Sequence, residues 1–254
     1  MRILISTALV GTLLAACSIS GGSSGEPVPT TVSRNTPAVG WGCVGDFCGI
    51  SYELGGANLA NLPKNGNLDY GQFGGAGSSS GEMLFASETL DSTVALIRDD
   101  MEGTGVIYSR LDRTVLPLGE VYYSGDYVGL VTNTGNGNVV FIINGAAALD
   151  VDFAGGDVYG GISGRTVLGP TGDAAIGVTS DDVVFWGPIN SQGLFSGVTS
   201  GGDINALSVT DAQAGTFDGL IAGLTGDEVV GGLDFVHSRT GDDYLETGAF
   251  FLQD

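Results

Sequence analysis

His237 is the only histidine of the 254-residue chain, and the residues after it could take part in acid–base or nucleophilic chemistry. Ser238, Arg239, Asp242 and Asp243 follow His237 at the end of an apolar run, so a nucleophile, a base and an orienting carboxylate are close in sequence. A hydrolase needs a frame that holds these groups together, and Ser238 does not lie in a Gly-x-Ser-x-Gly elbow. We interpret His237 as a strand-end or packing histidine, with a hydrolase as the weak alternative.

Paired aspartates occur at 99–100, 181–182 and 242–243 and could supply oxygen ligands. None of these pairs fits the twelve-residue calcium loop or a nonapeptide calcium repeat, so we interpret them as solvated turn carboxylates. The chain has no cluster of His and Cys for a transition metal. Its Gly-rich turns are not followed by Lys-Ser or Lys-Thr, as a phosphate-binding loop would be. We therefore expect no metal site, no cofactor and no catalytic residue.

The first 16 residues are typical of a secretory signal. Arg2 precedes an apolar run that is too short to span a bilayer and ends in small residues. The ending Leu14-Ala15-Ala16-Cys17 resembles the lipobox of bacterial lipoproteins. That resemblance implies that Cys17 is diacylated, with palmitate or a similar acyl group, and begins the mature chain. An ordinary signal peptide followed by a chance cysteine is the alternative.

The residue after Cys17 is Ser18 and not Asp, which by the same resemblance implies the outer membrane, facing outward or toward the periplasm. Each buried CH2 group of an acyl chain contributes about 0.8 kcal/mol, so several chains hold a protein on the bilayer without a transmembrane helix.

Cys43 and Cys48 are the remaining cysteines. An exported chain lies in an oxidising compartment, so we predict a Cys43–Cys48 disulfide that closes a tight loop and contributes roughly a few kcal/mol at most. A redox or metal site is the alternative. It is disfavoured because the spacing is not Cys-x-x-Cys and no other Cys pair or His lies nearby.

The formal charge of -21, from 8 basic and 29 acidic residues, excludes some classes of partner. Such an acidic protein repels nucleic acid and anionic lipid surfaces. The 45 glycines and only 7 prolines show no period of three, which excludes collagen. We interpret the acidity as a solvated surface that keeps the protein in solution, with an acidic site for a basic partner as the alternative.

Composition divides the mature chain into three parts. Residues 17–39 are rich in Gly, Ser and Pro and predict a flexible tether. Residues 40–116 predict a small β subdomain, with strands at 93–98 and 106–111, packed on the main domain. Pro117 marks the boundary. Residues 117–254 carry regularly spaced strands and turns, and we expect strands at 121–131, 139–143, 149–153, 158–164, 174–179, 183–186, 194–198, 217–223, 229–235 and 244–252.

Glycines that share a face with large apolar residues indicate that these strands curl. Gly219 alternates with Phe217 and Ile221 in one arm of a hairpin, and Gly231 alternates with Val229 in the other. A flat sheet gains nothing from losing side chains on its buried face, whereas a small closed barrel needs Gly where strands coil and bulky neighbours fill the interior. We predict an all-β chain with an antiparallel barrel of about eight to ten strands.

Four motifs give this barrel a family resemblance: Tyr123-Ser124-Gly125-Asp126-Tyr127-Val128-Gly129, Val151-Asp152-Phe153, Gly215-Thr216-Phe217-Asp218-Gly219 and Glu228-Val229-Val230-Gly231-Gly232. Their order and spacing resemble the C-terminal β-barrel of transferrin-binding protein B and of related solute-binding lipoproteins. The resemblance covers residues 119–254 and implies an eight-stranded barrel beside a β handle domain, carried on a lipid anchor. This chain is much shorter than transferrin-binding protein B, and none of that family's ligand-contact residues can be assigned to it.

Three functions follow as hypotheses. The favoured one is a non-enzymatic outer-membrane lipoprotein that binds a protein or a small solute. The alternatives are an envelope protein without a soluble ligand and, weakest, a hydrolase that uses His237. A barrel interior filled by side chains would leave only surface recognition, whereas an open interior would imply a small ligand.

Overall fold

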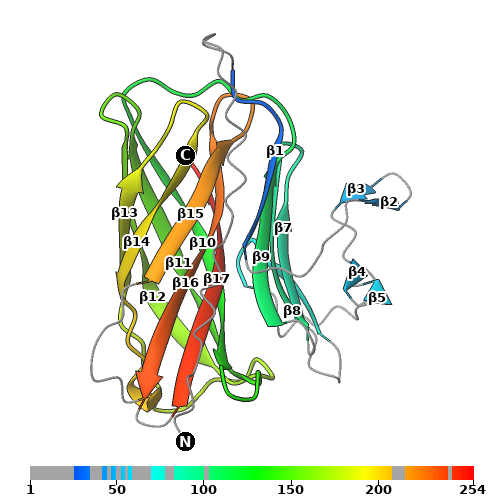
Figure 1. Cartoon of the computed structure of the whole chain (residues 1–254), viewed down its shortest axis with the longest axis vertical. Coiled ribbons are helices and arrows are strands. Elements are labelled where there is room, and N and C mark those ends of the chain that lie inside the picture. The colour runs from blue at the N-terminus through cyan, green and yellow to red at the C-terminus, as the bar shows by residue number, and fades with distance from the viewer. Residues whose placement is uncertain are drawn as a thin grey trace, which may run out of the picture.

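The structure is a computed structural model that describes residues 26–34, 42–44, 47–49, 53–54, 57–58, 70–77, 83–99, 103–207, 215–239 and 242–254. These residues form β-strands and their connections, with one short 3-10 helix, η3 (Asn205–Leu207). Figure 1 shows a barrel with a smaller sheet beside it. No helix among the described residues is long and apolar enough to cross a membrane.

The C-terminal part of the chain is a closed antiparallel barrel of eight strands, which confirms the predicted fold class. Closure is made by the first and last strands, which pair from Ser124 opposite Gln253 to Asn133 opposite Tyr244. The strands follow one another around the barrel as β10 (Glu120–Asn133), β11 (Val139–Asp152), β12 (Asp157–Leu168), β13 (Val183–Pro188), β14 (Leu194–Gly201), β15 (Gly215–Ala222), β16 (Glu228–Arg239) and β17 (Asp242–Gln253).

A second sheet of five strands has the order β1-β9-β8-β7-β6 and lies beside the barrel (Figure 1). Its strands are β1 (Thr30–Arg34), β6 (Gly74–Gly77), β7 (Met83–Glu88), β8 (Ser92–Asp99) and β9 (Gly103–Arg110). Two short hairpins pair β2 (Gly42–Val44) with β3 (Phe47–Gly49) and β4 (Glu53–Leu54) with β5 (Ala57–Asn58).

Glycines on the inner face of the barrel make room for aromatic rings, as the alternation in the sequence predicts. A Cβ on Gly219 would lie 2.3 Å from Cζ of Phe195, and a Cβ on Gly231 would lie 2.4 Å from Cζ of Phe250. No carbon atoms approach so closely without a bond, so each ring occupies the space that a side chain would need. The inference from glycine to a tightly curled, filled barrel is confirmed.

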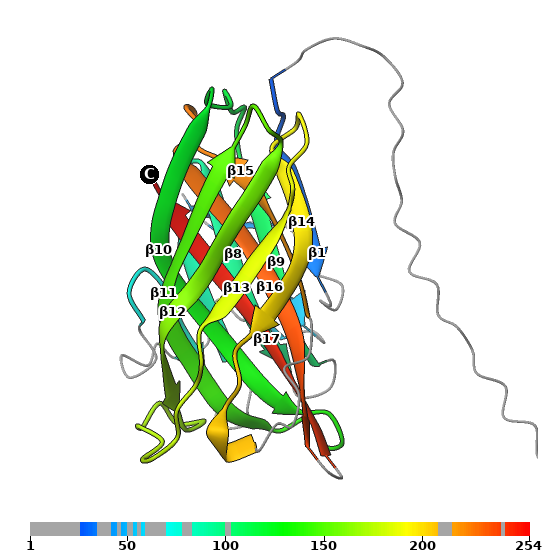
Figure 2. The ribbon, with the colours of Figure 1, turned by 90° about the vertical axis from the view of Figure 1, so that its left-hand side faces the viewer.

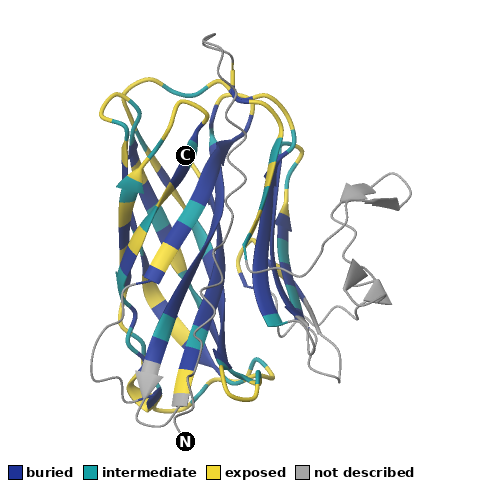
Figure 3. Cartoon of the chain, viewed as in Figure 1, coloured by how far each residue is buried: buried dark blue, intermediate teal, exposed yellow. Residues whose placement is uncertain are grey.

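The outer face of the barrel divides into a covered and an uncovered wall. In the second half of β10, from Tyr127 to Thr132, and on β15–β17, apolar residues run on, as in Ala249-Phe250-Phe251-Leu252, because both faces of the strand are buried there. The outward residues there pack against Phe85, Leu96 and Val106 of the five-stranded sheet. On β12–β14 buried and exposed residues alternate, and Figure 3 shows this wall as alternating dark blue and yellow.

Polar contacts fix the sheet on the barrel at its edge. Arg34 of β1 reaches Asp218 of β15 with Nη1 at 3.0 Å and Asp234 of β16 with Nε at 2.5 Å. Tyr108 of β9 donates its hydroxyl to Oδ1 of Asp218 at 2.7 Å. Burial is the largest cause that raises the pKa of Asp218, and Arg34 opposes it. Since β1 carries Arg34, the strand nearest the N-terminus takes part in joining the two sheets.

Three expectations from the sequence were wrong. Residues 30–34, expected in the flexible tether, form β1, because an extended Thr-Val-Ser segment pairs with the free edge of β9. Residues 139–143 and 149–152, expected in two strands, lie in the single strand β11, which continues through a register shift between Asn144 and Ala146, and Phe153 follows its end. Residues 174–179, expected as a strand, lie in the connection between β12 and β13, where Ala174 makes only an isolated bridge with Leu168.

Candidate functional site

The structure places His237 inside the barrel, where a polar cluster fills the space between the strands. His237 is 2% exposed, and its Nε2 lies 3.0 Å from Oε2 of Glu246. Arg165 donates from Nη2 to both carboxylate oxygens of Glu246 at 2.6 Å, and Tyr127 donates its hydroxyl to Oε1 at 2.8 Å. The four side chains come from β10, β12, β16 and β17 and join opposite walls of the barrel.

Electrostatics keep the Glu246 carboxylate ionised at neutral pH. Burial alone would raise the pKa of Glu246, but the charge of Arg165, together with His237 and their hydrogen bonds, outweighs burial and lowers the pKa to about 2. Burial, followed by the Glu246 charge, raises the pKa of the Tyr127 phenol well above its usual value. The phenol therefore stays protonated and acts as a hydrogen-bond donor to the carboxylate.

The cluster is built for packing and not for catalysis. Both oxygens of Glu246 accept hydrogen bonds from within the barrel, and its side chain is fully buried. The side chains of Ser238, Arg239 and Asp242 lie outside the described part of the chain, and the Cα atoms of Ser238 and Asp243 face each other across the β16–β17 ladder. A histidine sealed against a carboxylate inside a barrel cannot reach a substrate in solution, so the interpretation of His237 as a packing residue stands.

The other candidate ligands do not come together. Asp181 and Asp182 are exposed in the connection between β12 and β13. Asp100 and the side chain of Asp99 lie outside the described residues. Within the described ranges no group of three or more His, Cys, Asp and Glu side chains could hold a metal ion.

Two of the predicted cysteine features fall beyond what the structure describes. Residues 1–25, with the signal segment and Cys17, are not among the described residues. Cys43 of β2 and Cys48 of β3 are direct partners in the register of their hairpin. Their side chains are outside the description, so the disulfide stays a prediction.

The remaining barrel interior is filled by aromatic rings. The ring of Phe185 lies 4.8 Å from that of Phe217 and 6.0 Å from that of Phe250, measured between centroids. Phe217 also lies 5.9 Å from Phe195. These four rings are buried within one core cluster with the aliphatic residues of the inner wall. The interior is therefore a packed core, which leaves the outer surface for recognition.

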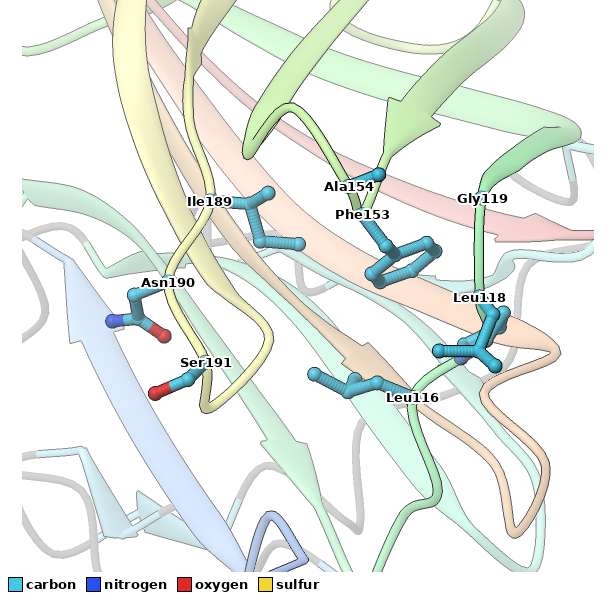
Figure 4. A pocket seen from close by; sticks show the side chains of 9 residues that line it. Leu116, Leu118, Gly119, Phe153, Ala154, Ile189, Asn190 and Ser191 are labelled. Atoms are coloured by element: carbon cyan, nitrogen blue, oxygen red, sulfur yellow. The ribbon is translucent and has the colours of Figure 1, made fainter. Parts of the chain in front are cut away.

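A concave apolar site lies at one end of the barrel, which we call the loop end. This end is formed by the turns β11–β12, β13–β14 and β15–β16 and by the segment that enters β10, at the top of Figure 1. The site, here named the loop-end pocket, has a volume of about 390 Å³ (Figure 4). It is lined by Leu116, Pro117, Leu118, Gly119, Phe153, Ala154, Ile189, Asn190 and Ser191.

Backbone hydrogen bonds hold the walls of the loop-end pocket in place. The amide of Phe153 donates to the carbonyl of Gly119 at 2.9 Å, which joins the entry of β10 to the β11–β12 turn. The amide of Ile189 donates to the carbonyl of Gly156 at 2.8 Å. Oδ1 of Asn190 accepts from the amides of Gln192 at 2.8 Å and Leu194 at 3.1 Å. These bonds make the pocket a preformed feature of the barrel end.

The lining can bind an apolar group but offers little for chemistry. Leu118 is 97% exposed at the mouth, while Phe153 and Ile189 are partly buried and pack on the core (Figure 4). Val115 and Leu224 extend the apolar surface and are joined by a hydrogen bond from the Val115 amide to the Leu224 carbonyl at 3.0 Å. No titratable side chain lines the pocket, so it suits binding and not acid–base catalysis.

No family model matches the sequence, and no curated protein does. Solved structures of three binding proteins are similar to the chain. Transferrin-binding protein B from Haemophilus parasuis Hp5, as a Trp-to-Ala mutant, is 14% identical with a TM-score of 0.49, over 89% of this chain and 45% of that one. Isotype 1 transferrin-binding protein B from serogroup B Neisseria meningitidis is 16% identical with a TM-score of 0.49, over 89% and 44% of the two chains.

The haemoglobin receptor HpuA from Kingella denitrificans is 12% identical with a TM-score of 0.43, over 91% of this chain and 89% of that one. The chain spans less than half the length of the two transferrin-binding protein B chains. The resemblance to transferrin-binding protein B that the sequence motifs indicate is thus found again among solved structures.

Sequence reasoning missed the residues that shape the surface. Leu116 and Leu118 lie in a connection for which the sequence predicts only a boundary at Pro117, and Phe153, expected in a strand, follows β11. The two leucines around Pro117 were the available signal: Leu118 is 97% exposed, while Leu116 is partly buried against the barrel core.

Proposed function

We propose that this chain is a non-enzymatic binding module, anchored by acylated Cys17 in the outer membrane, that recognises a protein or a small solute at the loop end of its barrel. The filled interior carries this proposal, because aromatic rings and the Arg165–Glu246 cluster occupy the space in which an open barrel would hold its ligand. The loop-end pocket then offers the preformed concave surface, with an apolar lining and two polar side chains.

The position of Pro27 supports an anchor on the same end as the pocket. The carbonyl of Pro27 accepts the amide of Thr114 at 3.1 Å, two residues before Leu116 of the pocket. Pro27 lies ten positions after Cys17, and an extended chain spans at most about 3.3–3.6 Å per residue, so the tether reaches roughly 35 Å at most. A partner held at the loop end would therefore stay close to the membrane surface.

Site-directed photocrosslinking on intact cells tests this proposal. Leu118 at the pocket mouth and Ile176 in the connection at the opposite end are both 97% exposed, so they form a matched pair. We expect Leu118→p-benzoylphenylalanine to give a discrete crosslinked product that Ile176→p-benzoylphenylalanine does not give. The product should disappear when Phe153→Asp places a charge in the pocket. Equal products from both positions, or none from Leu118, would contradict recognition at the loop end.

A further inference from the structure

A row of exposed aromatic side chains crosses the uncovered wall of the barrel. Tyr122 of β10, Tyr159 of β12, Trp186 of β13 and Val198 of β14 are each 40% to 58% exposed. They lie in one lateral register: Tyr122 is opposite Asp150, Asp150 is opposite Tyr159, Tyr159 is opposite Trp186, and Trp186 is opposite Val198. We call this set, with Asp150, the aromatic row.

The aromatic row covers most of the wall that the second sheet leaves free. Four strand spacings of about 4.8 Å give it a width of roughly 19 Å. Beyond Val198 the register continues to Thr216, whose hydroxyl and carbonyl accept hydrogen bonds from Arg34 of the sheet. The row therefore ends where the sheet begins, and Figure 2 shows β11–β14 in front of the barrel with the sheet behind them.

A row of carboxylates borders the aromatic row. Glu120 is opposite Asp152, and Asp152 is opposite Asp157, two residues along each strand from the aromatic row and thus about 7 Å away. Asp150 adds a carboxylate within the row itself, between the two tyrosines. Glu120, Asp150 and Asp157 are exposed.

No positive charge balances these carboxylates on the same wall. All residues from 120 to 201 are described, and the only Lys or Arg among them is Arg165, which is buried against Glu246 inside the barrel. Asp152 accepts hydrogen bonds from the amides of Ala154 and Gly155, but it has no cationic partner on this wall. Exposed aromatic faces beside carboxylates without a cationic partner attract guanidinium and ammonium groups, through cation–π contact with the ring and charge pairing with the acid. Anionic lipid headgroups are repelled by the same carboxylates.

We propose that the aromatic row is a docking surface for a basic protein, with Arg or Lys side chains of the partner lying over Tyr122, Tyr159 and Trp186 and pairing with Asp150 and its neighbours. A width of roughly 19 Å matches part of a protein surface and exceeds what a single small cation would contact. This surface is separate from the loop-end pocket, and the inference does not depend on the ligand of that pocket.

Binding of a labelled nona-arginine peptide to the purified full chain tests the proposal. We expect the Tyr159→Ser/Trp186→Ser double variant to weaken binding by about tenfold, from two cation–π contacts at exposed sites. Tyr159→Phe and Trp186→Phe should keep most of the affinity, because the ring faces remain, and these variants also guard against a folding defect in the double variant. Leu118→Ser should bind the peptide as the unchanged protein does.

A matched charge pair separates local contact from general attraction. Asp150→Asn and Asp173→Asn change the net charge equally, and Asp173 is exposed in the connection between β12 and β13, away from the row. We expect Asp150→Asn to weaken nona-arginine binding by roughly threefold and Asp173→Asn to leave it unchanged. Equal weakening by both variants would overturn the proposal, and so would a double variant that binds as tightly as the unchanged protein. Sedimentation with phosphatidylcholine vesicles that requires Trp186 would assign the row to lipid and also overturn it.

Discussion

Gly248 on the inner face of β17 tests how tightly the barrel interior is filled. It is the register partner of Gly129 on β10, and the phenol of Tyr127 lies across both glycines to reach Glu246. A Cβ on Gly248 would lie 2.1 Å from the Tyr127 hydroxyl oxygen and 2.3–2.4 Å from two ring carbons. Gly248→Ala must therefore displace the ring and its hydrogen bond.

The cost of Gly248→Ala follows from two effects. Overpacking a filled core costs about 1–3 kcal/mol, and loss of a hydrogen bond to a charged group costs about 1.5–3 kcal/mol. Reduced entropy of the unfolded chain offsets only about 0.4–1 kcal/mol. We expect the free energy of unfolding to fall by roughly 2–5 kcal/mol, measured by urea unfolding of the purified protein.

A double-mutant cycle isolates the contact with Tyr127. In a Tyr127→Leu background the ring is absent, so Gly248→Ala should cost less than about 1 kcal/mol and the coupling free energy should exceed about 1 kcal/mol. Gly169→Ala is the control, because a Cβ there meets only the Asp173 carbonyl at 3.6 Å, an ordinary contact. Equal costs of Gly248→Ala in both backgrounds would refute the reasoning.

The remaining predictions concern the buried charges, the anchor, the hairpin and the second sheet. The pKa of Glu246 is lowered from 4.5 to about 2 in the folded protein. Ionised Glu246 therefore stabilises the fold fully above pH 4.5, and this stabilisation is lost as the pH falls toward 2. Glu246→Gln should flatten the pH dependence of Tm between these two values. Cys17→Ser should move the protein from the detergent phase to the aqueous phase in phase partition. Cys43 and Cys48 should react with an alkylating reagent only after reduction. Arg34→Ala should speed amide hydrogen exchange in β1 while exchange in β10–β17 stays unchanged.

The sequence could predict the barrel because the alternation of residue types along a strand indicates which face of the strand is buried. Gly219 and Gly231 share their inner face with large apolar residues, and that pattern alone indicates curvature and filling. The prediction of a strand at 174–179 was wrong because Ala, Ile and Val also occur in a connection that folds back on the barrel end. Residues 30–34 carry no apolar run, so only the free edge of β9, supplied by tertiary structure, makes them a strand.

The site could be predicted less well than the fold, because it depends on contacts between distant segments. Up to 81 positions separate Arg165, His237 and Glu246 in the sequence, and no local pattern predicts that their side chains meet inside the barrel. The aromatic row joins residues of five strands through their register, which the sequence does not show. The acidic composition predicts that the protein repels nucleic acid. It does not predict on which side of the barrel the aromatic rings and carboxylates lie together.

Xenon binding under pressure in crystals of the protein tests the central claim most directly, since recognition on the outer surface follows from a barrel without an internal chamber. The account predicts no xenon among the rings of Phe185, Phe217 and Phe250, because their centroids lie only 4.8–6.0 Å apart and leave no empty apolar space. A well-occupied xenon atom between these rings would show a cavity able to hold a ligand and would contradict the account.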